Sequence, residues 1–167
     1  YLPSKHIDIA LAALGIVRQK ISNATLTLVG PEDPVYGAKL RTKFADLVKS
    51  GSVTFAGQRP NSETPILYSS HTLSINLAAD GHYDKSVLES VACGTPVALY
   101  SHAFNEEGQR NIVRVPNLFL IGEQRTSEAL ANMILFILGD PLRWEASAIR
   151  GRNVVIEQES LKKLAEK

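Results

Sequence analysis

The chain has 167 residues, of which 44% are hydrophobic and 21% are charged; this is the size and composition of one globular domain and excludes a disordered or collagen-like protein. With 18 Lys and Arg against 17 Asp and Glu, the net charge of +1 argues against binding to nucleic acid or to an anionic membrane. The single cysteine, Cys93, rules out an internal disulfide scaffold, and no apolar run is long enough for a transmembrane segment.

Helical and alternating patterns follow one another from the start of the chain. Apolar residues at helical spacing predict a first helix over residues 7–21, with Ser4 as its cap. Alternating apolar residues over 24–29 predict a strand that ends at Gly30. A second helix is predicted over residues 40–48. The chain therefore starts as helix, strand, helix.

The same alternation continues to the end of the chain. The other predicted elements are strands at 53–56, 73–77, 96–100 and 118–121 and helices at 64–68, 85–93, 127–138 and within 150–167. Because helices separate strands and no hairpin dipeptide joins two apolar runs, we expect parallel pairing with right-handed crossovers. The predicted fold class is α/β, a doubly wound parallel sheet with helices on both faces. In such sheets ligands bind beyond the carboxyl ends of the strands.

Several catalytic and cofactor motifs are absent from the sequence. It contains no G-x-G-x-x-G, G-x-x-x-x-G-K-[ST] or G-x-S-x-G motif and no paired-cysteine metal spacing. This argues against a dinucleotide oxidoreductase, a P-loop enzyme, an α/β-hydrolase and a zinc site. The four histidines show no ligand spacing either, so we expect no bound metal.

The most informative segment, residues 76–97, joins a predicted strand, a polar loop, a helix and a further strand. Gly81 permits a close backbone approach, and the helix presents the unpaired amides of its first turn, near Ser86, with its positive dipole end. Lys85 adds a full charge, so a diphosphate is the natural occupant. Glu89 lies one turn further, in reach of a hydroxyl-rich group beside the phosphates.

A purely structural interpretation of the same residues stays open on physical grounds. Lys85 and Glu89 stand four residues apart, and such a surface pair contributes only a few tenths of a kcal/mol to helix stability. Asp84 can be a helix cap beside a solvated Lys85. Lys5, near a helix start, can equally be a solvated charge.

The run KSVLESVACGTPV, residues 85–97, resembles the signature of the retaining, group 1 nucleotide-sugar glycosyltransferases. These enzymes have the GT-B architecture of two Rossmann-like domains, and the C-terminal one holds the donor. The similarity extends over nearly the whole chain, from residues 3–5 through 26–30 and 53–57 to 153–164. It implies that residues 1–167 form a single Rossmann-like nucleotide-sugar-binding domain, the C-terminal half of such an enzyme.

The resemblance also implies roles for individual residues. Lys5 and Lys85 are the implied catalytic residues, which stabilise charge on the leaving diphosphate, and Glu89 matches the glutamate that holds the donor ribose. The remaining implied donor-binding residues are Gly57, Gln58 and Arg59 beside the base, the amides of Ser86 and Val87 at the diphosphate, and the loop residues Gly81, His82, Tyr83 and Asp84. No cofactor and no essential metal is implied.

Two departures from the family pattern stand out. Gly81 occupies the place of the family's first motif glutamate, which contacts the transferred sugar. Either Asp80 or Asp84 replaces that carboxylate, or the chain belongs to a branch whose loop reads Gly-x-x-Asp-Lys, which we favour. The chain also begins after the point where the family has its first strand, which leaves a gap in the sheet that another molecule could fill.

The implied function is transfer of a sugar from a nucleoside diphosphate sugar to a hydroxyl acceptor with retention. The acceptor is expected to bind through an N-terminal domain, so this fragment is expected to be inactive alone. The implied localisation is cytoplasmic, with that domain as the route to a peripheral place at the inner membrane face. Two alternatives are kept: a nucleotide-sugar epimerase, which should lack the 85–97 run, and a non-catalytic sugar-nucleotide-binding or interaction module, which the glycine at position 81 favours.

Overall fold

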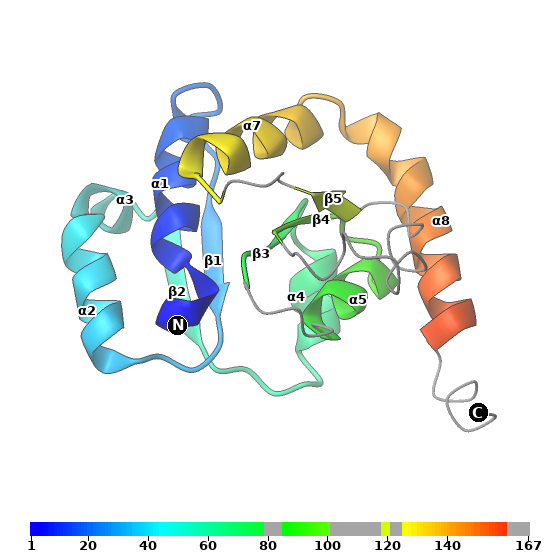
Figure 1. The fold of residues 1–167 in the computed structure, drawn as a ribbon, viewed down its shortest axis with the longest axis horizontal. Coiled ribbons are helices and arrows are strands. Elements are labelled where there is room, and N and C mark those ends of the chain that lie inside the picture. The colour runs from blue at the N-terminus through cyan, green and yellow to red at the C-terminus, as the bar shows by residue number, and fades with distance from the viewer. Residues whose placement is uncertain (79–84, 101–117, 121–124, 160–167) are drawn as a thin grey trace.

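The computed structural model describes residues 1–78, 85–100, 118–120 and 125–159 (Figure 1). Strands and helices alternate along these residues. In chain order the elements are the 3-10 turn η1 (Pro3–Lys5), α1 (Ile7–Arg18), β1 (Leu26–Val29), α2 (Pro34–Lys43), α3 (Ala45–Lys49), β2 (Val53–Gly57), α4 (Thr64–Ser69), β3 (Ser74–Asn76), α5 (Lys85–Ala92), β4 (Val97–Leu99), β5 (Leu118–Leu120), α7 (Ser127–Leu138) and α8 (Pro141–Glu159).

The strands form two parallel sheets. β1 pairs with β2, with a register shift between Leu28 and Val29, and β4 lies between β3 and β5, where Ala98 stands opposite both Ile75 and Phe119. Every described strand pair is parallel, as the alternation of strand and helix predicts. Among the described strands, none lies between β1 and β3, so the two sheets remain separate.

Helix α1 lies between two of the three hydrophobic cores. Its Ala13 and Val17 face α7 and pack in a cluster with Leu130 of that helix, and Figure 1 shows α1 and α7 crossing beside one another. Its Leu11 faces the other way, towards Leu40 and the β1–β2 sheet. Because apolar residues cover two sides of this helix, it is buried along most of its length.

The third core joins α5 and α8 to the central strand of the larger sheet. Val87 and Val91 of α5 pack with Leu99 of β4 and Val155 of α8, all almost inaccessible to solvent. The terminal helix therefore packs on this domain. It begins at Pro141, earlier than the predicted range of 150–167.

The starts of the first two helices differ from their predicted positions. Ser4 lies inside the turn η1 and does not cap α1; the helix begins at Ile7 after His6, whose φ of 48° is left-handed. The His6 N–H donates to the Pro3 carbonyl and closes the turn. The hydrogen bonds of α1 then begin at the His6 carbonyl, which accepts from the Ile9 and Ala10 N–H groups. The predicted second helix is two helices, α2 and α3, which meet at Phe44.

Candidate functional site

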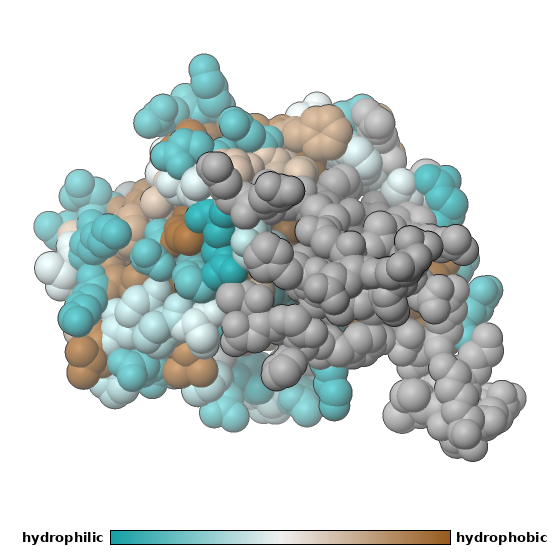
Figure 2. All heavy atoms as spheres, viewed as in Figure 1, coloured by the Kyte–Doolittle hydropathy of each residue, from teal (hydrophilic) through white to brown (hydrophobic). Residues whose placement is uncertain are grey.

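A cavity of about 860 Å³ lies between the two sheets. Its lining comes from η1, α1, β1, α4, β3, α7 and the start of α5. Figure 2 shows the molecule from one face, with hydrophilic side chains gathered over α2 and α3 and hydrophobic ones along α7. In parallel α/β sheets, ligands bind beyond the carboxyl ends of the strands. The part of the cavity near those ends is therefore the candidate binding site.

Two of the predicted site residues line this cavity. Lys5, the exposed last residue of η1, and Ser86, in the first turn of α5, both line it. Asn76, the last residue of β3, donates from Nδ2 to Ser86 Oγ at 3.0 Å, and its Oδ1 accepts from the Ala78 N–H at 3.1 Å. The Asn76 side chain thus ties the carboxyl end of β3 to the start of α5.

The other predicted residues of α5 divide into one buried and two exposed side chains. Val87 is 1% exposed and packs in the core, so only its backbone amide is available to a ligand. Lys85 and Glu89 are both exposed, and no ion pair joins them in the described structure. Gly81, His82, Tyr83 and Asp84 lie outside the described residues.

The predicted base-side loop begins at a backbone position in the left-handed region. Gly57 ends β2 with a φ of +70°, a conformation that favours glycine. Its carbonyl accepts from the Gly30 N–H at 2.9 Å, which joins the carboxyl ends of β1 and β2. Gln58 and Arg59 are exposed, and Arg59 Nη1 lies 3.8 Å from Oε2 of Glu63.

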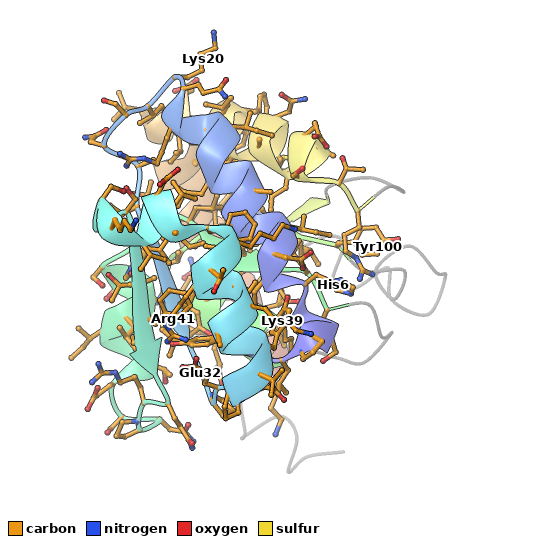
Figure 3. The ribbon with its side chains drawn as sticks, turned by 90° about the vertical axis from the view of Figure 1, so that its left-hand side faces the viewer. His6, Lys20, Glu32, Lys39, Arg41 and Tyr100 are labelled. Carbon is orange, nitrogen blue, oxygen red and sulfur yellow. The ribbon has the colours of Figure 1, made fainter. Side chains whose placement is uncertain are left out.

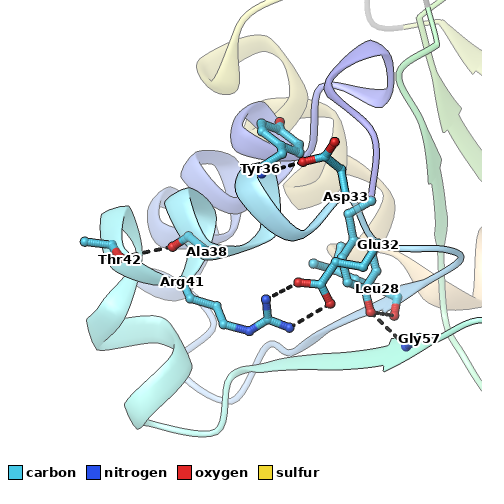
Figure 4. A network of polar contacts seen from close by, with 9 residues as sticks. Leu28, Glu32, Asp33, Tyr36, Ala38, Arg41, Thr42 and Gly57 are labelled. Carbon is cyan, nitrogen blue, oxygen red and sulfur yellow. Dashed lines mark hydrogen bonds and ion pairs between the residues drawn. The ribbon is translucent and has the colours of Figure 1, made fainter.

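Tyr1 fixes this loop in a way that the sequence does not reveal. Its hydroxyl accepts from the Gly57 N–H at 2.8 Å and donates to the Leu28 carbonyl at 3.1 Å, so it bridges β1 and β2 where their register shifts (Figure 4). Tyr1 is 4% exposed and lines the cavity. The two partners are 27 and 56 residues away in sequence, and no local pattern predicts such contacts.

The sequence also did not predict a charged cluster that lies beside this loop. Arg41 of α2 forms two contacts with the Glu32 carboxylate, one of them 3.0 Å long (Figures 3 and 4). Its guanidinium lies 4.0 Å from the centre of the Phe55 ring. Phe55 in turn meets the Tyr1 ring edge-on at 5.4 Å. The hydrogen bond from Arg41 lowers the pKa of Glu32. The cluster therefore joins α2 to β2 and to the segment after β1.

Metal-binding clusters and membrane helices were sought in the described parts of the chain. These parts contain no group of three His, Cys, Asp or Glu residues that could hold a metal ion. None of their helices combines the length and the apolar character that crossing a bilayer requires. Burial raises the pKa of the Cys93 thiol, which keeps it protonated at neutral pH.

The fold has counterparts among solved structures. The C-terminal domain of a glycosyl transferase group 1 family protein, LpcC from Francisella tularensis, is 18% identical with a TM-score of 0.81, over 96% of this chain and 83% of that one. Sucrose-phosphate synthase from Thermosynechococcus elongatus is 25% identical with a TM-score of 0.71, over 93% and 39%. Alr3699/HepE from Anabaena, solved with UDP and glucose, is 19% identical with a TM-score of 0.74, over 100% and 46%.

These likenesses define the class of the domain. It is an α/β domain of the kind that forms the C-terminal domain of GT-B glycosyltransferases, which confirms the predicted fold class. Residues 1–140 match the family described as Glycosyl transferases group 1, and the chain belongs to that family. It spans less than half the length of the sucrose-phosphate synthase and Alr3699/HepE chains. A comparison with curated proteins found no match.

Proposed function

We propose that this domain binds the nucleoside diphosphate sugar donor of a retaining glycosyltransferase, the activity expected of the full-length protein. Lys5 and Ser86 are far apart in the sequence, yet both line one cavity between the sheets. This observation carries the proposal. Membership of the group 1 family supports it. The chemistry of these residues suits a diphosphate, because a lysine and the first amides of α5 supply positive charge and hydrogen-bond donors.

In this proposal the cations act on the leaving group. As the bond between the sugar and the diphosphate breaks, negative charge grows on the diphosphate. Lys5, Lys85 and the amides of Ser86 and Val87 stabilise that charge without reorganising, which lowers the barrier. This electrostatic role needs no metal ion.

The remaining residues orient the donor. Glu89 is exposed on α5 one turn beyond Lys85, where a carboxylate can accept hydrogen bonds from both ribose hydroxyls. The loop that begins at Gly57, with Gln58 and Arg59, is proposed to flank the base, and the segment 81–84 to complete the donor pocket. Alr3699/HepE was solved with UDP, which makes UDP the first nucleotide to test.

A non-catalytic sugar-nucleotide module is the second candidate. The glycine at position 81 favours it, because the family's motif places there a carboxylate that contacts the transferred sugar. Both candidates predict donor binding, and they differ in turnover. Release of sugar from the donor by the full-length protein, in the presence of acceptor, supports the glycosyltransferase; binding without release supports the module.

The test is a calorimetric titration of the 167-residue protein with UDP, GDP and ADP and their glucose conjugates. We expect selective binding of one nucleotide, weakened about tenfold by Lys85→Ala, since one charge-assisted contact to phosphate is removed. Glu89→Ala should weaken the binding of a nucleoside diphosphate sugar and the binding of the corresponding nucleoside diphosphate by similar factors, because both contain the ribose.

Matched controls separate the site from general charge effects. Lys20, two residues after the end of α1, points away from the body of the protein (Figure 3), so Lys20→Ala removes the same charge at a distance. Glu157→Ala is the corresponding control for Glu89→Ala, because it removes a carboxylate from the exposed side of α8. Equal losses in a site variant and its control would contradict the assigned role. Absence of binding by both this protein and the full-length protein would contradict the proposed function.

A further inference from the structure

The Arg125 guanidinium has no partner for its charge among the described residues. Arg125 is half-buried in the segment that leads into α7, and its Cζ lies 4.1 Å from the centre of the Tyr100 ring. Its Nε atom is buried without an acceptor, and it forms no ion pair with the described residues. Unpaired buried polar groups are uncommon in folded proteins, and a bound ion or substrate is one of the few things that account for them.

Stacking on Tyr100 fixes the plane of this guanidinium and leaves its donors available. The contact with the ring uses the face of the guanidinium, whereas its N–H groups point outward in its plane. Because Nε is buried, a ligand reaches the group through its two Nη atoms. Two parallel N–H donors match the two oxygens of a carboxylate or a phosphate. The Arg125 side chain is therefore preorganised for an anionic group.

Tyr100 places the guanidinium at the carboxyl ends of the strands. Its N–H donates to the Asn76 carbonyl at 2.9 Å, so it follows β4 at the level where β3 ends. The Asn76 side chain in turn donates to Ser86, which lines the cavity. Tyr100 packs in one cluster with Ala10 of α1, and Figure 3 shows Tyr100 and His6, the residue before α1, at the same edge of the protein. This is the edge at which the donor is proposed to bind.

The order of the strands assigns the anionic group to the sugar end of the donor. The cavity lies between β1 and β3, with β2 beyond β1 and β4 beyond β3. In the proposed function, the base lies beside the loop at Gly57, where β2 ends, and the diphosphate lies between Lys5 and Ser86. The group attached to the other end of the diphosphate then extends towards the end of β4, where Tyr100 and Arg125 lie. This step rests on the proposed function.

We propose that Arg125 binds a carboxylate or a phosphate group that a substrate carries at the sugar end of the donor site. Two molecules can supply this group: the transferred sugar, if it is a uronic acid, or an acidic or phosphorylated acceptor. A neutral sugar together with a neutral acceptor would leave the guanidinium unpaired. The proposal therefore narrows the substrates to a pair in which at least one member is anionic beside the diphosphate.

The first test observes Arg125 in the unaltered protein. The isotope-labelled protein is saturated with the nucleoside diphosphate that it selects, and the arginine Nε–H signals are followed by NMR as inorganic phosphate or acetate is added. Arg125→Lys identifies the Arg125 signal. We expect this signal to shift in a saturable way. Arg150, exposed on α8 with a hydrogen bond to Ser147 Oγ, should move less and reports general salt effects.

The second test separates the two sources of the anion. Calorimetry compares the glucuronate and glucose conjugates of the same nucleoside diphosphate in the parent protein and in Arg125→Gln. If the sugar carries the anion, the parent protein binds the glucuronate conjugate at least about tenfold more tightly, since a charge-assisted contact is gained, and Arg125→Gln binds both equally. If the acceptor carries it, the parent protein binds both conjugates equally, and inorganic phosphate still shifts the Arg125 signal in the complex with the glucose conjugate.

The outcomes distinguish this proposal from the proposed function. Nucleoside diphosphate binding with no response of Arg125 to any of these anions overturns the proposal alone, and so does a preference for glucuronate that persists in Arg125→Gln. Absence of nucleotide binding by both this protein and the full-length protein overturns the proposed function, and this proposal with it. Urea denaturation checks that Arg125→Gln stays folded without the stacking contact, and the NMR test needs no substitution at the site.

Discussion

Removing one hydroxyl group tests whether Tyr1 holds the β1–β2 sheet together. Tyr1→Phe keeps the ring and its edge contact with Phe55 but deletes the oxygen that joins two strands. The Gly57 N–H loses its acceptor at 2.8 Å and the Leu28 carbonyl loses its donor at 3.1 Å. The residue is almost fully buried, so water is poorly placed to replace the lost partner.

The expected cost follows from these two bonds. A neutral hydrogen bond contributes about 1 kcal/mol net, so the loss of two corresponds to about 2 kcal/mol of unfolding free energy. For a protein of this length that amounts to a fall in Tm of about 4–8 °C. Tyr36→Phe is the matched control, because the Tyr36 hydroxyl also makes two contacts, both to Asp8, at 3.1 and 3.3 Å, in a half-buried position. Water can replace the lost partners at this half-buried position, so Tyr36→Phe should cost less than Tyr1→Phe, although one of its bonds is to a carboxylate.

The assay is urea denaturation of the two variants and the parent protein, with the slope of unfolding free energy against urea checked for constancy. Hydrogen exchange at the Gly57 amide provides a local reading, because its opening should become easier in Tyr1→Phe alone. If Tyr1→Phe costs no more than Tyr36→Phe and the Gly57 amide exchanges as before, the bridging role of Tyr1 is refuted.

Substitutions at three further positions test the same end of the sheet. Gly57→Ala introduces a Cβ that meets no atom within 4 Å, so only its left-handed φ of +70° opposes it; we expect a cost of about 1–2 kcal/mol by urea denaturation. Asp33 caps α2 by accepting from the Tyr36 N–H at 2.7 Å, and Asp33→Ala should lower the unfolding free energy by about 1 kcal/mol, with Asp33→Asn much closer to the parent. Arg41 lowers the folded-state pKa of Glu32, so the pair stabilises the fold above the ordinary glutamate range and loses its effect as pH falls through the lowered pKa. The stability difference between the parent and Glu32→Gln should therefore shrink towards acid, and a difference that grows there would contradict the pairing.

Local signals in the sequence locate most elements. The predicted helix at 127–138 is α7 as observed, because an apolar period, a threonine cap and a following glycine all act within one short segment. Thr126 Oγ1 accepts from the Ala129 N–H at 3.1 Å. Parallel pairing was also predictable, since it follows from the alternation of strand and helix alone.

What the sequence could not predict depends on contacts between distant residues. The break between α2 and α3 at Phe44 has no proline or glycine to mark it. The bridge from Tyr1 to Gly57 and the stacking of Arg41 on Phe55 form only once the β1–β2 sheet has assembled. A pattern of local periodicity carries no information about either.

The candidate site shows the same division. The resemblance placed Lys5 and Ser86 in one site although 80 residues separate them, and the structure brings both to the same cavity. The residues alone left Lys85 and Glu89 open between a surface pair and a ligand site. The described structure forms no ion pair between these two side chains, and their roles toward a ligand stay predictions.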